Sequence, residues 1–189
     1  MAKKITKLEK RGGALEKTME AALNDQLNEE LRASYVYLGM AAHCESHSLP
    51  GFGQWLWQQS REEYDHAMRF YRFILDRNAA VTLKDLGAPP TEYESVLALV
   101  EEALEHERMV TRSIYDLYTL ANEQGDYASL TLLHQFAAEQ VEEEKSLTDI
   151  IDTLNLVGAD GAGMFMLDRE LGKRVGATAL GEPPAGSGG

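Results

Sequence analysis

The chain reads AAVTLKDLGAPPT from Ala79 to Thr91, and this stretch separates two pairs of long segments that are rich in helix-forming residues. Its Pro-Pro step does not belong inside a continuous helix. At roughly 3.3 Å per extended residue the stretch can reach about 40 Å, comparable with a helix of about 27 residues at about 1.5 Å each. The connection is therefore long enough to cross a helical bundle from one end to the other.

Four long helices flank this connection. The composition predicts them over four ranges, namely Ala14 to Cys44, Phe52 to Asn78, Glu92 to Asn122 and Tyr127 to Val157. Short turns around Pro50-Gly51 and Gly125-Asp126 indicate that the first two helices and the last two form antiparallel hairpins. Two hairpins joined by one long crossover predict an all-α fold, a four-helix bundle.

The two ends of the chain differ in composition from the bundle. Residues 1–13 are basic and end in two glycines, so we expect a flexible N-terminal arm. Residues Gly161 to Lys173 predict a short fifth helix. Residues 175–189 are rich in Gly and Pro, which predicts a disordered tail. A single domain, residues 14–174, remains between the arm and the tail.

The charge balance narrows the choice of partners. Asp and Glu number 31 against 18 Lys and Arg, which gives a formal net charge of −13. This argues against nucleic acid and anionic membrane surfaces and favours a cation, most simply a metal ion. Cys44 is the only cysteine, no secretory signal pattern is visible, and charges interrupt every apolar segment. We therefore expect a cytoplasmic protein with no membrane span.

Acidic residues interrupt the apolar seam of each long helix near its middle. They are Glu30 in the first helix, Glu63 with His66 in the second, Glu107 in the third and Glu143 in the fourth. Any one of them alone reads as a solvated glutamate. Together they would bury unpaired carboxylates, which is costly, and the seams offer no Lys or Arg at that level. Two metal cations would neutralise the cluster, so the pattern predicts a dinuclear metal centre.

The donor atoms indicate which metal would bind. Four carboxylates and one imidazole form a hard, oxygen-rich set that suits iron or manganese better than copper, with zinc as a competitor. Glu63 and His66 are three residues apart and project from one face of their helix, so Glu63 can bridge two ions while His66 binds one. We expect iron.

Four sequence segments resemble those of a known protein family. They are LNDQLNEELRASYVY, REEYDHAMRF, EHERMVTRSI and AAEQVEEEKSLTDIID, and with them residues 15 to 173 resemble the bacterial non-haem ferritins. The resemblance implies a ferritin-like bundle whose di-iron centre oxidises Fe(II) with O2, a ferroxidase activity. It also implies storage of the ferric product as mineral in a closed homo-oligomeric cage of 24 subunits.

The same resemblance assigns roles to individual residues. It implies that Glu30, Glu63 and His66 bind the first iron. Glu63, Glu107 and Glu143 would bind the second, with Gln140 close to the bridging oxygen species. A third, weaker iron site would comprise Glu62, Glu139, Glu142 and Glu143, although a solvated acidic face accounts equally well for the first three. Tyr37 matches a tyrosine that donates an electron during oxygen reduction, with a core aromatic as the alternative reading.

The fourth helix separates the candidate functions. It carries Gln140-x-x-Glu143 rather than a second Glu-x-x-His, so only one metal has a histidine ligand and the second should be held more loosely. This favours storage over a di-iron or di-manganese oxygenase, which would also need an apolar substrate pocket. A metal-free structural bundle would predict a missing ligand. Tyr64 stands where bacterioferritins place a haem-binding methionine, so we expect no haem.

Overall fold

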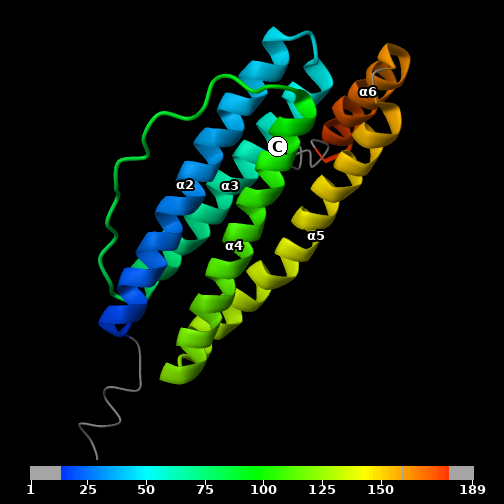
Figure 1. Ribbon diagram of the computed structural model, residues 1–189. Coiled ribbons are helices and arrows are strands. Elements are labelled where there is room, and N and C mark those ends of the chain that lie inside the picture. Colours follow the sequence, from blue (N-terminus) through cyan, green and yellow to red (C-terminus); the bar gives the residue numbers. More distant parts are fainter. Residues whose placement is uncertain (1–13, 159, 179–189) are drawn as a thin grey trace, which may run out of the picture.

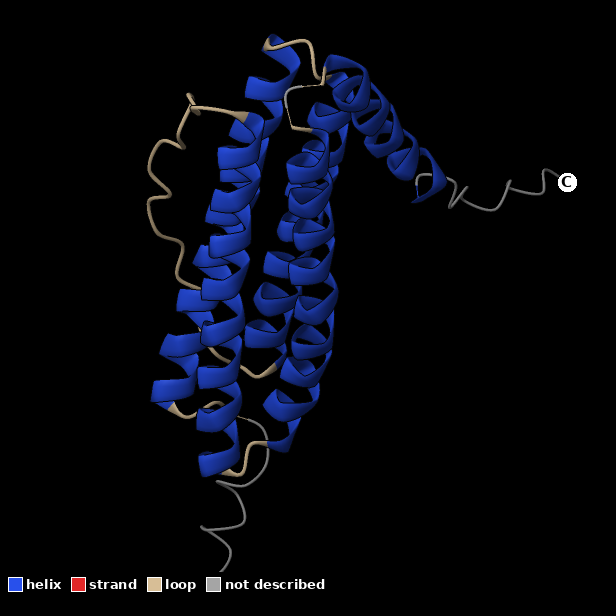
Figure 2. Ribbon diagram, turned by 45° about the vertical axis from the view of Figure 1, so that its right-hand side comes forward, coloured by secondary structure: helices blue, strands red, loops and turns tan. Residues whose placement is uncertain are grey.

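The computed structural model describes residues 14–158 and 160–178, and the described part of the chain is helical with no strand (Figures 1 and 2). The predicted N-terminal arm lies outside these residues. The helices are α2 (Lys17–Ser46), α3 (Pro50–Asp76), α4 (Val96–Gln124), α5 (Tyr127–Val157) and α6 (Gly161–Thr178). The all-α prediction of four long helices and a fifth is confirmed.

Seven helix boundaries differ from the prediction, by two to five residues, and local sequence features account for two of them. Helix α4 begins at Val96 because the Ser95 side chain caps it, accepting a hydrogen bond of 3.0 Å from the Ala98 amide. Helix α3 includes Pro50 in its first turn, where a missing N–H costs nothing. Helix α6 continues to Thr178, so the first residues of the predicted tail are helical. The rest of that tail, residues 179–189, lies outside the described residues.

Helix α2 pairs with α3 and α4 pairs with α5, and the crossover between α3 and α4 runs along the outside of the bundle, as predicted (Figure 1). Two asparagines of α2 hold this crossover in place. Asn24 donates to the Ala80 carbonyl and accepts from the Thr82 amide. Asn28, one turn later, donates to the Thr82 carbonyl at 2.8 Å and accepts from the Lys84 amide at 2.7 Å. The two side chains thus provide the hydrogen-bond donors and acceptors that the extended backbone of the crossover needs.

Helix α6 is attached to the start of α3. The carboxylate of Asp168 accepts a hydrogen bond of 2.9 Å from the backbone amide of Phe52, in the first turn of α3. The close approach depends on glycine, since a Cβ on Gly51 would lie 1.7 Å from the carbonyl oxygen of Asp168. This contact explains why the fifth helix folds against the bundle.

The apolar core is divided into two clusters. One contains Met40, Phe52 and Leu56, and the other contains Leu27 and Phe70. The acidic residues predicted for the metal centre lie between these two clusters in the sequence of each helix. The bundle therefore surrounds a polar layer with apolar packing above and below, which excludes water and fixes the helices. None of the described helices is long and apolar enough to span a bilayer.

Candidate metal centre

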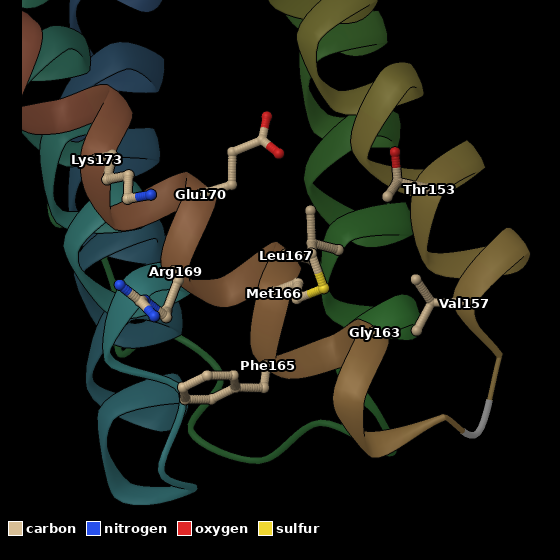
Figure 3. A pocket seen from close by; sticks show the side chains of 9 residues that line it. All are labelled: Thr153, Val157, Gly163, Phe165, Met166, Leu167, Arg169, Glu170 and Lys173. Carbon is tan, nitrogen blue, oxygen red and sulfur yellow. The ribbon is translucent and has the colours of Figure 1, made fainter.

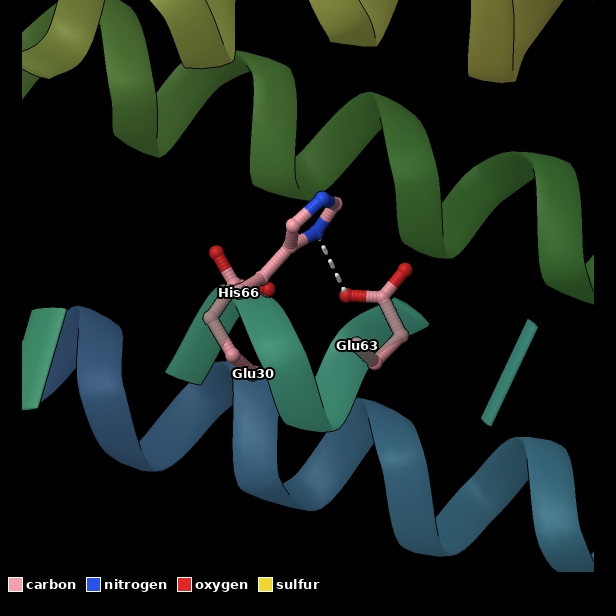
Figure 4. Close-up of side chains that lie close together, drawn as sticks. All are labelled: Glu30, Glu63 and His66. Atoms are coloured by element: carbon pink, nitrogen blue, oxygen red, sulfur yellow. Dashed lines mark ion pairs between the residues drawn. The ribbon is translucent and has the colours of Figure 1, made fainter. Parts of the chain in front are cut away.

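Three predicted ligands from two helices converge in the middle of the bundle. Glu30 comes from α2, whereas Glu63 and His66 come from α3, and one ligand atom from each lies within 4.8 Å of the others (Figure 4). Glu30 is 0% exposed and Glu63 is 2% exposed. His66 Nδ1 lies 3.4 Å from Glu63 Oε2. Neither carboxylate has an ion pair with Lys or Arg within the described residues, so neither of these cationic side chains compensates the cost of burying the two charges.

Helices α4 and α5 supply the remaining predicted ligands. Glu107 is buried, and it accepts a hydrogen bond of 2.6 Å from the hydroxyl of Tyr37 and one of 3.1 Å from Gln140 Nε2. Glu143 lies close enough to Glu107 for the two negative charges to interact. These residues complete the layer, but within the described residues only Glu30, Glu63 and His66 come together at metal-binding distances.

Burial favours the protonated form of several of these carboxyl groups in the absence of metal. Desolvation is the largest cause at each site, followed by a neighbouring carboxylate: Glu63 for Glu30, and Glu107 for Glu63 and Glu143. The pKa values of Glu30 and Glu63 are raised well above the ordinary range, and that of Glu143 is raised to about 7. A cation entering this layer therefore has to displace protons, which couples metal binding to pH.

Neutral amides support the carboxylates. The three donor–acceptor pairs are Gln26 Nε2 to Glu30 Oε1 at 2.9 Å, Gln140 Nε2 to Glu107 Oε2 at 3.1 Å, and Gln59 Nε2 to Glu143 Oε2 at 3.1 Å. An amide N–H orients a carboxylate without neutralising it, so the layer keeps its affinity for cations. Sequence reasoning missed Gln26 and gave Gln59 no role. Their positions one helical turn from a ligand on the same helix were the available signal.

The residues predicted for a third site do not gather into one group. Glu139 forms an ion pair of 2.6 Å with Arg69 and lies 3.7 Å from His66 Nε2. Glu62 is half-buried, and its charge contributes to the raised pKa values of Glu63 and Glu143. Glu142 is exposed. These residues do form an acidic face, but Glu139 is already paired with Arg69.

A surface hollow between α5 and α6 lies apart from this layer. It is lined mainly by α6 side chains that include Phe165, Met166 and Arg169, and by Thr153 and Val157 from α5 (Figure 3). None of the predicted metal ligands lines it. It therefore does not supply the apolar substrate pocket beside the metals that the oxygenase alternative requires.

Residues 20–157 match the model of the ferritin-like domain. The chain belongs to the ferritin family. Its relatives include the bacterial non-heme ferritins of Staphylococcus haemolyticus, 39% identical over 160 residues, and Staphylococcus aureus strain USA300, 37% identical over 161 residues. The alignments cover 85% of this ferritin in both cases, with 96% and 97% of the relatives.

Solved structures agree with this assignment. An open-pore ferritin from the hyperthermophilic archaeon Archaeoglobus fulgidus is 40% identical, with a TM-score of 0.82 over 84% of this ferritin and 96% of that chain. A humanized archaeal ferritin is also 40% identical, with a TM-score of 0.83 over the same shares of the two chains. The match to the family model, residues 20–157, includes every predicted ligand on the four long helices.

Proposed function

We propose that Glu30, Glu63, His66, Glu107 and Glu143 form the ferroxidase centre of this iron-storage ferritin. As a member of its family the protein binds iron, oxidises Fe(II) and stores the ferric product. The observation that carries the residue assignment is the convergence of Glu30, Glu63 and His66 within 4.8 Å, with both carboxylates buried. Burial without a Lys or Arg partner is costly, and bound Fe(II) offsets it.

The residues of the chain have separable tasks in this reaction. Glu63, whose carboxyl group interacts with those of Glu30, Glu107 and Glu143, would bridge the two Fe(II) ions, and His66 would bind one of them. The buried glutamates release their protons as iron enters, because the cation stabilises the charged form. The two Fe(II) ions supply the electrons and O2 accepts them. The second iron would have only carboxylate ligands, Glu63, Glu107 and Glu143, and no histidine.

The acidic face formed by Glu62, Glu139 and Glu142 serves the passage of iron between the centre and the storage cavity. It is at least partly open to water, and Glu139 lies 3.7 Å from the His66 ring. These carboxylates with Glu143 form a third, weaker iron site in this proposal. We expect no haem, because Tyr64 stands where a haem-binding methionine would be required.

Storage requires a cage, and we expect one of 24 identical subunits. Large apolar side chains are widely exposed on the single subunit, with Tyr127 79% exposed, Leu156 88% and Met166 72%. The net charge of −13 suits a cavity that accumulates iron cations.

The test is anaerobic loading with Fe(II) followed by air, with ferric absorbance and particle mass as readouts. Glu63→Gln removes the bridging charge, and Asp65→Asn, an exposed residue on the same helix, is the matched control. Rapid oxidation in the wild type and the control, slowed at least tenfold in Glu63→Gln, supports the assignment. Particles that hold many more irons than subunits establish storage. About two irons per chain and no mineral would instead favour the oxygenase reading.

A further inference from the structure

A chain of two hydrogen bonds connects α4 to the ligand Glu30. The hydroxyl of Ser113 donates to Gln26 Oε1, and Gln26 Nε2 donates to Glu30 Oε1 at 2.9 Å. Gln26 is 1% exposed and Glu30 is 0% exposed. The three residues come from two helices, and Gln26 precedes Glu30 by one turn of α2. A contact of this kind between buried polar groups fixes side-chain geometry rather than merely filling space.

The direction of the two hydrogen bonds determines the orientation of the Gln26 amide. An amide oxygen can only accept and an amide nitrogen can only donate. If the amide turned over, its oxygen would face the ionised carboxylate that Glu30 presents to a cation, and two acceptors would meet in a buried site. Ser113 favours the observed orientation because its hydrogen goes to the amide oxygen. The serine thereby acts on Glu30 through the glutamine.

The consequence is that the two oxygens of Glu30 are not equivalent. Oε1 accepts the hydrogen bond from Gln26, whereas Oε2 is buried and has no hydrogen-bond partner among residues 14–158 and 160–178. A buried carboxylate oxygen without a partner is unfavourable unless a ligand arrives. The carboxylate lies beside Glu63 and His66, with which it forms the cluster of Figure 4. One oxygen is thus held by the protein and the other is left for a cation.

We propose that Gln26 and Ser113 are positioning residues that hold Glu30 as a ligand through a single oxygen and thereby set the affinity of the first iron position. The proposal rests on the role of Glu30 as an iron ligand proposed above. A glutamine is suited to this task because it orients the carboxylate without adding positive charge that would repel Fe(II). Partners of metal ligands commonly have such a role.

The test measures binding of Co(II), which reports its coordination by visible absorbance without an oxidation step, to the assembled protein. Gln26→Leu removes the hydrogen bond to Glu30 in a similar volume, and we expect about 10- to 100-fold weaker binding at one of two positions. Ser113→Ala should weaken it a few-fold, because Gln26 can still donate, and Ser113→Thr, which keeps the hydroxyl, should restore it. Thr119→Ala, which removes an exposed hydroxyl from the same helix, is the control.

Kinetics with Fe(II) provide a second readout. We expect Gln26→Leu to raise the KM for Fe(II) about tenfold or more while kcat changes less, because the variant loses ligand orientation and keeps the ligands. Unchanged Co(II) affinity in a folded Gln26→Leu variant overturns the proposal. If that variant does not fold, equal affinities of Ser113→Ala and Ser113→Thr overturn it. Unchanged Co(II) binding in Glu30→Gln would instead contradict the ligand assignment itself, so the two failures are distinguishable.

Discussion

Tyr37 of α2 donates a hydrogen bond of 2.6 Å to Glu107 of α4, across 70 positions of the sequence. Burial raises the pKa of the Tyr37 hydroxyl well above its usual value, and the charge of Glu107 raises it further. The phenol therefore stays protonated and remains a donor throughout the physiological pH range. It links a redox-capable ring to a proposed ligand of the second iron.

Replacing this tyrosine should affect turnover more than binding. Tyr37→Phe removes a hydrogen bond to a charged acceptor, worth about 1.5–3 kcal/mol, and leaves every ligand in place. We expect two irons still to bind per subunit and the oxidation rate to fall several-fold, measured by stopped-flow absorbance over successive additions of Fe(II). Tyr35→Phe, in which the ring is exposed, is the control. An unchanged rate in Tyr37→Phe would leave the ring with a packing role only.

The stability of the metal-free protein should fall as pH rises. Burial, and then the charge of Glu107, raise the pKa of Glu143 from 4.5 to about 7, and Glu30 and Glu63 are shifted in the same direction. The folded state retains protons that the unfolded chain releases near pH 4.5, so this stabilisation is complete below about 4.5 and is lost as pH rises through the folded values. We expect a lower free energy of unfolding at about pH 8 than at about pH 5.5.

Chemical denaturation in the presence of a chelator measures this effect. Glu143→Gln removes one of the titrating groups, so the stability of this variant should depend less on pH between about 5.5 and 8. Zn(II), a redox-inert competitor for the ligands, should reverse the trend, because deprotonated carboxylates bind it more tightly at higher pH. Stability of the metal-free protein that increases over this range would contradict the raised pKa values.

The docking of α6 provides a test that is independent of iron. A Cβ on Gly51 would lie 1.7 Å from the backbone oxygen of Asp168, which cannot move without displacing α6. A Cβ on Gly53 would meet Glu45 Cγ at 2.7 Å, an atom of a flexible side chain that a change of rotamer can move. Alanine is favoured over glycine in a helix by about 1 kcal/mol, and this preference alone would stabilise both alanine variants equally.

We therefore expect Gly51→Ala to destabilise the protein by at least about 2 kcal/mol, whereas Gly53→Ala should be close to neutral. Thermal unfolding of the two metal-free variants measures the difference. Asp168→Ala should weaken the same attachment through loss of the hydrogen bond to Phe52. Equal unfolding temperatures for the two glycine variants would show that α6 docks without the close approach.

The architecture could be predicted from the sequence because it depends on periodic and local features. The range of α5 was predicted without error, and the crossover followed from the length of the Ala79–Thr91 stretch. The Ser95 cap was overlooked, although serine before an apolar run is a recognised signal. The role of Gly51 could not be predicted. It was interpreted as a turn residue, but its close contact is with a residue on α6, far away in the sequence.

In the metal centre, too, features set by helical periodicity could be predicted, whereas contacts set by the packing of helices could not. The helical period placed Glu30, Glu63 and His66 on inward faces, and the structure brings them together. Hydrogen bonds between side chains on different helices could not be predicted. Ser113 and Gln26, for example, are 87 positions apart, and their contact depends on how α2 and α4 pack. The ion pair between Arg69 and Glu139 was likewise missed, because α3 and α5 are neighbours only in the folded bundle.

That ion pair leads to a prediction about the proposed third iron site. Arg69 donates to Glu139 at 2.6 Å and to Gln135 at 3.1 Å, and its guanidinium carbon lies 3.9 Å from the centre of the Phe136 ring. Arg69 therefore pairs with the Glu139 carboxylate, which would otherwise be available to iron. Its positive charge also lies beside the route that iron would take from the centre.

Removing this charge should strengthen the third site. In Arg69→Gln we expect anaerobic Fe(II) titration to show a third binding step several-fold tighter than in the wild type, since about 1 kcal/mol of competing interaction is lost at this partly exposed position. Arg69→Lys, which keeps the charge, should resemble the wild type, and Arg69→Gln combined with Glu139→Gln should lose the gain. If Arg69→Gln binds iron as the wild type does, Glu139 is a surface carboxylate held by its arginine, and iron does not pass through it.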